Sequence, residues 1–409
     1  MIFTYDSDNA TRGAHFADEI AALWLQEQGR ATLTNLQGLV ALSLGLGLLR
    51  QDRLALIYAR QMPPVCIELG RKVNRSIRIG KKEYTSPEYQ RSLQLARWSA
   101  FQMEVDFCMI WVKPLELSKP VIERPYTAEQ CHYTSEVWRP YPKPGPDVVF
   151  NPYGLRDLKF NLREIGADIV PVMLSGDPGD SPALGNITLD RRARMARLEE
   201  LLLKLHSWKE SLPTYAVTDP MMIPTWSLVE LHLVYHDYCI AVESLMLRDL
   251  VSVGSKRQEA KVGVLRACEQ IADIFGWFPH TLGVSIWCPW GFQAAAMAAY
   301  PLLDLLEEPG VADTFYTIIH CIFTVAKRWV LARGVIKMLW ITIQDRQLIP
   351  HLDQQTVDLF TFSAIKGWGP EDYRLFKSCI YPNYAAIGEN GRELADMGEL
   401  LEQWSKISI

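Results

Sequence analysis

The sequence lacks closely spaced cysteines, although it contains eight of them. The nearest pair, Cys268 and Cys288, is 20 residues apart, so no CxxC unit exists and the ligand spacing of a zinc finger is absent. The chain also starts without the basic and apolar stretches of a secretory signal, which argues against a disulfide framework. We therefore expect reduced, mostly buried cysteines, a protein that is not secreted, and no metal or other cofactor.

The chain has no excess of positive charge either. It carries 42 Lys and Arg against 47 Asp and Glu, which gives a net charge of −5. Nucleic-acid surfaces need clustered basic side chains, and only residues 71–82 are basic without a single acid. Because no aromatic residues interleave for base stacking, we interpret this stretch as a solvated loop and expect no direct nucleic-acid contact.

One long stretch lacks charge altogether. Residues 275–303 contain no Asp, Glu, Lys or Arg, and this run is longer than the roughly 20 residues that cross a bilayer. Pro279, Pro289 and Pro301 interrupt it, however. We therefore expect a bent, buried helical segment and no membrane contact.

Strand signals are few, and most segments have helical periodicity. Only 77–79 and 169–172 resemble strands, whereas Met195, Leu198 and Leu202 exemplify the common helical spacing. Residues 113–154 are too rich in proline for regular structure. The sequence predicts an all-α fold with one helical domain over 1–409, comprising a half at 1–174, a loop at 175–186 and a half at 187–409.

Three helix starts are suggested by capping patterns. Thr34 with Gln37 and Ser227 with Glu230 have the spacing of capping boxes. Ser86 followed by Pro87 is typical of an N-cap with proline at the first helical position, opening a helix through Phe107 or beyond.

Several motifs follow one another in a specific order. The first runs from Thr34–Gln37 to Glu68–Gly70. The second places Phe101 three residues after Trp98, Glu104 six after it, and Lys113-Pro114 near its end. The last four are Leu205–Pro213, Leu231–His236, Trp290–Ala295 and Arg328–Ala332.

Together these motifs, over roughly residues 15–340, resemble the fungal-specific transcription factor domain, the helical middle homology region of fungal zinc binuclear cluster regulators. The resemblance implies an all-helical regulatory scaffold. The family has Asp and Arg where Glu104 and Lys113 stand, and these two residues could still pair. The zinc cluster and basic linker of the family are absent, and the N-terminus looks clipped relative to it.

His232 and His236 are the first candidate site residues, because four-residue spacing places them on one helical face. Packing in the core, acid–base chemistry in a pocket, and metal binding are all compatible with this spacing. Residues of the Leu-His-x-x-Tyr-His motif occupy both positions, so packing is the simplest interpretation, and we expect no metal.

An aromatic cluster supplies the other candidates. Aromatic rings with a few polar tips line small-molecule pockets, although core packing is their commoner use. The candidate ligand-binding residues are Trp277, Phe278, Trp287, Trp290, Phe292 and Tyr316, and the further candidate acid–base residues are His280 and His320.

Two functions remain open because no nucleophile elbow, phosphate-binding loop or paired-carboxylate motif is present. The first is a nuclear regulatory module that responds to a small apolar metabolite or a protein partner, with a homodimer as a further option. The second is a cytoplasmic, cofactor-free enzyme of the cyclase or isomerase type, acting on an apolar intermediate of secondary metabolism.

Overall fold

The computed structural model describes residues 12–48, 51–139, 147–175, 189–217, 225–250, 254–282, 289–326 and 330–361. Its first helices are α2 (Arg12–Glu27), α3 (Leu33–Leu48), α4 (Asp52–Ala59), α5 (Met62–Arg78), α6 (Pro87–Trp111), α7 (Ala128–Tyr133) and α8 (Pro152–Met173). The later ones are α9 (Arg191–Glu210), α10 (Trp226–Asp249), α11 (Ser255–Leu282), α12 (Pro289–Leu303), α13 (Val311–Ala326), α14 (Val330–Asp345) and α15 (Gln354–Leu359). The prediction of an essentially all-helical fold is confirmed.

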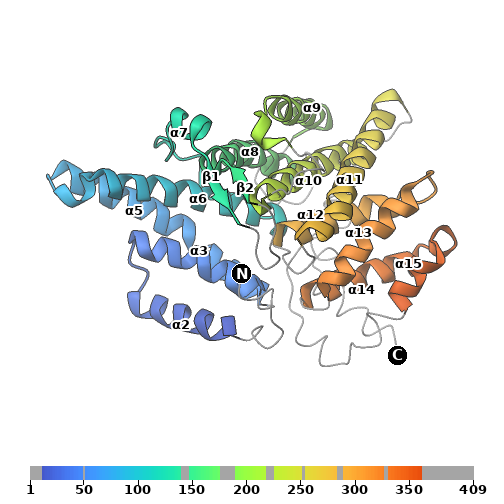
Figure 1. Ribbon diagram of the computed structural model, residues 1–409, viewed down its shortest axis with the longest axis horizontal. Helices are drawn as coiled ribbons and strands as arrows, with labels where there is room; N and C mark the ends of the chain where they lie inside the picture. Colours follow the sequence, from blue (N-terminus) through green and yellow to red (C-terminus); the bar gives the residue numbers. More distant parts are fainter. Residues whose placement is uncertain are drawn as a thin grey trace.

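Helix α10 lies at the centre of the arrangement. Helices α2 to α5 occupy one end and α11 to α15 the other, with α6, α8 and α10 between them (Figure 1). Nearly every residue from Val229 to Met246 is buried, including His232 and Glu243. A helix that is covered on all sides must bury its polar residues too. The partners of those residues therefore determine what this helix can do.

Of the capping predictions, the one for Ser86 is confirmed and the one for Thr34 with Gln37 is wrong. Ser86 caps α6 as expected, with its hydroxyl accepting a hydrogen bond from the N–H of Tyr89 at 3.2 Å. The first capping box is wrong, because α3 already begins at Leu33 and the Thr32 hydroxyl accepts from the N–H of Asn35. A cap belongs just outside the first turn, and Thr34 lies within it.

Two predicted irregular regions contain regular structure. The basic stretch 71–82 is not a loop up to Arg78, because α5 extends that far, with its basic side chains exposed around buried Val73 and Ser76. Within the proline-rich segment, β1 (Glu136–Trp138) pairs antiparallel with β2 (Val148–Phe150), and Val137 lies opposite Val149. Conversely, the strand-like stretches 77–79 and 169–172 belong to α5 and α8 or directly follow them.

The second sequence motif joins α6 to the segment that follows it. Trp98 is buried and its indole N–H donates to the carbonyl of Glu123 at 3.1 Å. The carboxylate of Glu104 accepts from the N–H groups of Glu116 at 2.6 Å and Leu117 at 2.8 Å. Through these two hydrogen bonds, Glu104 holds the backbone that follows Lys113 in place. An ion pair between the side chains of Glu104 and Lys113 would not by itself hold that backbone.

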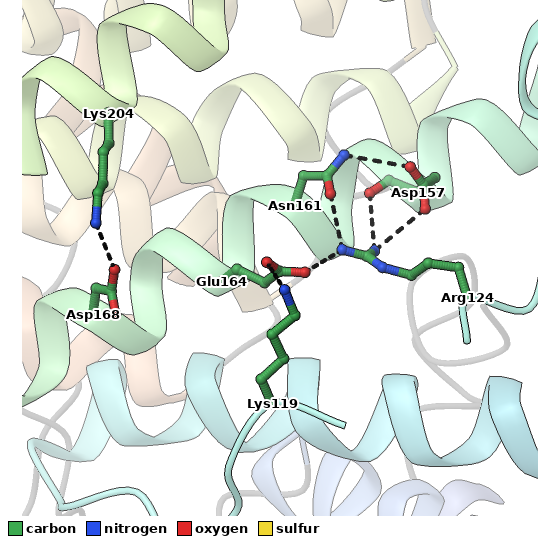
Figure 2. A network of polar contacts seen from close by, with 7 residues as sticks. All are labelled: Lys119, Arg124, Asp157, Asn161, Glu164, Asp168 and Lys204. Atoms are coloured by element: carbon green, nitrogen blue, oxygen red, sulfur yellow. Dashed lines mark hydrogen bonds and ion pairs between the residues drawn. The ribbon is translucent and has the colours of Figure 1, made fainter. Parts of the chain in front are cut away.

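Arg124 anchors the same segment to α8. Its guanidinium donates to the side chains of Asp157 at 3.3 Å and Asn161 at 2.8 Å, and also pairs with Glu164, as Figure 2 shows. The guanidinium carbon lies 3.9 Å from the centroid of the Trp98 ring, within cation–π range. The motif tryptophan therefore contributes to a stacked and charged junction between α6, the loop and α8.

A buried ion cluster joins α6, α8 and α10. Arg163 donates to Asp106 at 3.0 and 3.2 Å and to Glu230 at 3.3 Å, and Lys159 donates to Glu230 at 2.7 Å. The predicted capping role of Glu230 is therefore wrong. Its carboxylate is used in this cluster, and α10 begins at Trp226, before Ser227.

Other predictions concern burial and membrane contact. Five cysteines, such as Cys108 and Cys239, are buried as free thiols, and Cys131 is half-buried. The two remaining ones, Cys288 and Cys379, lie outside the described residues. In the described ranges, no helix is both long and apolar enough to cross a bilayer. The loop predicted at 175–186 lies almost wholly outside these ranges.

Candidate functional site

Two adjoining cavities open beside α10. The first cavity has a volume of about 1150 Å³ and lies between α9, α10 and α11. The second cavity, of about 870 Å³, lies between the end of α9, α10, α11 and α13. Both are lined by Lys209, His236 and Gln270. These three side chains therefore mark the junction of the two cavities.

Lys209 and His232 form the best-defined polar contact at this junction. The Nζ atom of Lys209 lies 2.7 Å from Nδ1 of His232, and Nε2 of the same imidazole lies 2.8 Å from the carbonyl oxygen of Ala216. A carbonyl oxygen only accepts hydrogen bonds, so Nε2 must carry the ring hydrogen. In the neutral imidazole Nδ1 is then an acceptor, and it takes a hydrogen from the Lys209 amine.

Burial makes both groups less basic. It lowers the pKa of the Lys209 ammonium to about 8. Burial, aided by the neighbouring charge of Lys209, lowers the pKa of His232 to about 4. Among the described residues, no carboxylate lies within ion-pair distance of the Lys209 amine to offset this loss of hydration. At neutral pH His232 is therefore neutral, and an appreciable fraction of Lys209 is the free amine.

His236 and Tyr235 form the wall beside this pair. The two rings contact edge to face with centroids 4.9 Å apart, and Tyr235 stacks on Trp208 at 5.6 Å. Burial holds the pKa of His236 well below its usual value, with the charge of Lys209 as a second cause. The wall of the first cavity therefore combines a neutral imidazole with an aromatic face, which suits stacking and hydrogen bonding.

Glu243 contributes an acid to the first cavity. It is buried, and burial raises the pKa of its carboxyl to about 8 despite the opposing charge of Arg266. A Cβ atom added to Gly263 would lie 1.6 Å from its Oε1, so glycine on α11 makes room for this carboxyl group. At neutral pH Glu243 is mostly protonated and can donate a hydrogen bond into the cavity.

The predicted site residues are only partly brought together. His232 lines the second cavity and His236 lines both, as described above. His320 is exposed on α13, its ring 6.0 Å from that of Tyr316, and neither residue lines either cavity. Phe292 is buried in the core on α12 and lines neither of these two cavities.

The remaining aromatic candidates cannot be placed in the cavities. Trp277, Phe278 and His280 belong to α11 and Trp290 to α12, but their side chains lie outside the described part of the chain. Trp287 lies outside it entirely. The assignment of these residues to ligand binding or acid–base chemistry therefore stays a prediction.

A metal site has no support from the described residues, because no group of three His, Cys, Asp or Glu side chains among them could hold an ion. The spacing of His232 and His236 reflects their shared helix face, and His232 uses both ring nitrogens for Lys209 and Ala216.

Sequence reasoning missed Lys209, although a signal for it exists. Leu202, His206 and Lys209 follow one another at spacings of four and three residues, and all three line the first cavity. A lysine that continues the apolar side of a helix is a candidate for a partly buried amine. The burial itself depends on α10, which is distant in the sequence.

Comparison of the chain with known proteins gives no further assignment. No protein-family model, no curated protein and no solved structure matches it. The resemblance to the fungal-specific transcription factor domain stays a prediction.

Proposed function

We propose that the chain is a regulatory, effector-response module resembling that of fungal transcription factors, and that its first cavity binds a small, largely apolar metabolite. The observation that carries the proposal is this cavity of about 1150 Å³. Its volume is slightly above the roughly 300–1,000 Å³ of typical small-molecule sites. The regulatory part of the proposal rests on the order of the sequence motifs.

The composition of the wall supports a ligand with an apolar body and several polar groups. Leu202, Met246 and Val262 supply apolar surface, while Glu243 is mostly protonated at pH 7 and Lys209 is mostly charged, with roughly a tenth of it as the free amine. Charged and polar side chains such as Glu199 and Arg266 complete the wall, so the ligand would carry polar groups beside its apolar body. A ligand in this position would touch α9, α10 and α11 together and would stabilise their packing.

The test compares two valine-to-tryptophan variants for ligand-induced thermal stabilisation. Val262→Trp places an indole in the first cavity, and Val149→Trp places one on the exposed surface of β2. Decanoic acid, decanol and 3-phenylpropanol serve as probes at increasing concentrations. We expect at least one probe to raise the melting temperature of the wild type and of Val149→Trp, and not that of Val262→Trp. Equal responses of both variants would remove the first cavity as the binding site.

A second candidate function is a cofactor-free enzyme of the cyclase or isomerase type. The contact between Lys209 and His232, beside neutral His236 at the junction, favours it, because the Lys209 amine, whose pKa is lowered to about 8, can accept and return protons near neutral pH. The distinguishing experiment incubates the full chain with apolar polyenes and enones and follows new masses or isomers. A product that disappears in His236→Gln would favour the enzyme, and ligand stabilisation without any product would favour the regulator.

A further inference from the structure

Lys209 has the surroundings of a reactive amine. Most of its side chain is covered, yet its Nζ atom lies at the junction of the two cavities. Several surface lysines pair with carboxylates, as Lys256 does with Glu199 at 2.5 Å. Lys209 instead contacts the imidazole of His232 and lies 5.3 Å from the centroid of the Tyr235 ring.

The geometry at His232 directs the amine lone pair. Because Nε2 of His232 donates to Ala216, its Nδ1 receives one amine hydrogen of Lys209 at 2.7 Å. The nitrogen lone pair is then not used by the imidazole. Since Lys209 lines both cavities, that lone pair is available to a bound molecule. His232 acts here as a positioning residue, which holds the amine without reacting itself.

We propose that Lys209 binds a carbonyl compound, an aldehyde or ketone with an apolar body, as a reversible imine in the first cavity. This proposal rests on the proposed function and specifies the chemical class of its ligand. The apolar body would lie against Leu202 and Met246, and the carbonyl carbon would meet the amine at the junction with the second cavity.

The reaction balances without an oxidant or reductant. The lone pair of the Lys209 nitrogen forms a bond to the carbonyl carbon, and the carbonyl π electrons move to oxygen. The oxygen takes up both amine hydrogens through solvent in the open cavity and leaves as water. The product is a C=N bond between the ligand and Lys209, and hydrolysis reverses the reaction.

The state of the amine supports this chemistry. Burial lowers the pKa of Lys209 to about 8, whereas the side chain of an ordinary lysine titrates near 10.4. At pH 7 the neutral fraction of Lys209 is therefore on the order of 100-fold larger than that of a surface lysine. Only the neutral amine attacks a carbonyl, so Lys209 should react selectively.

Reductive trapping on the full chain tests the proposal. The protein is incubated at pH 7 with 3-phenylpropanal and sodium cyanoborohydride, which reduces an imine to a stable secondary amine. Intact-mass and peptide mass spectrometry then locate the adduct. Lys209→Met keeps the length of the side chain but lacks the amine. Lys204→Met is the matched control, because Lys204 lies on the same helix outside the cavity lining, is partly exposed and pairs with Asp168 at 3.1 Å.

We expect one adduct per chain, mapped to Lys209, that falls at least tenfold in Lys209→Met and is unchanged in Lys204→Met. Adducts spread over exposed lysines, or an equal yield in Lys209→Met, would overturn the proposal. Peptide mapping of the wild type decides this even if the Met variant fails to fold.

The alcohol 3-phenylpropanol separates this proposal from the proposed function, because it fits the same space but cannot form an imine. Thermal stabilisation by the alcohol with no trapped adduct from the aldehyde would overturn the imine and leave the binding cavity intact. If the alcohol does not stabilise the protein and the aldehyde gives no adduct, the imine proposal and the proposed function are both overturned.

Discussion

Replacing Glu230 by Gln tests the buried ion cluster directly. The substitution keeps the size of the side chain and removes its charge. Lys159 is then left buried with no carboxylate partner among the described residues, whereas Arg163 keeps both contacts to Asp106. Removing one partner of a buried pair typically costs roughly 3–5 kcal/mol, because the remaining charge is desolvated without compensation. We expect a loss of this size in the free energy of unfolding.

The same variant distinguishes this role from a capping role. In a capping box Gln replaces Glu with little change, because either side chain can accept the backbone hydrogen bond. Ser227→Ala serves as the control. The hydroxyl of Ser227 accepts only one hydrogen bond from Lys159, at 3.3 Å, so its removal should lower the free energy of unfolding by about 1 kcal/mol. Urea unfolding followed by circular dichroism measures the stability of both variants. Glu230→Gln as stable as the wild type would refute the reasoning from the ion cluster.

The pH dependence of the free energy of unfolding supplies a second check on the role of Glu230 in the ion cluster. Burial alone raises the pKa of the Glu230 carboxyl, but the charges of Lys159 and Arg163 outweigh it and hold the pKa below its ordinary value. The stability that Glu230 contributes is therefore complete above its unfolded pKa of about 4.3 and is lost as the pH falls through the folded pKa. The difference between wild type and Glu230→Gln should stay constant from neutral pH down to about pH 5 and shrink below about pH 4.

Three further predictions concern the core and the first cavity. Trp98→Ala should lower the free energy of unfolding by roughly 3–5 kcal/mol in urea titrations, and a soluble, undestabilised variant would contradict its place in the core. Gly166→Ala should destabilise by about 1–3 kcal/mol, because a Cβ there would lie 2.5 Å from the hydroxyl oxygen of buried Tyr238. Gly38→Ala, with open space around it in α3, should instead stabilise by about 0.5–1 kcal/mol, and equal effects at the two glycines would refute the packing argument. Burial raises the pKa of Glu243 to about 8, so the stability it contributes is complete below its unfolded pKa of about 4.3 and should be lost as the pH rises from there to about 8. Melting temperatures of Glu243→Gln should lack this loss, and identical pH profiles for variant and wild type would refute it.

The sequence by itself determined the helical class and much of the core. Periodic apolar residues predicted α9, and Ser86-Pro87 predicted the start of α6, because capping and periodicity act within a few residues. Trp98 and Trp208, which lie within the sequence motifs, are both buried. Candidate residues His232 and His236 also proved to lie on one helix beside a cavity.

Only the tertiary structure decided which polar groups act together. Glu230 had the spacing of a cap, but Lys159 and Arg163 on α8 provide stronger, charged partners, and these contacts span about 70 residues of sequence. The pairing of β1 with β2 likewise depends on register across a proline-rich segment. Lys209 has no unusual neighbours in the sequence. Its loss of basicity arises because α10 covers the side chain and places His232 against its amine, so desolvation, which depends on packing, determines its chemistry.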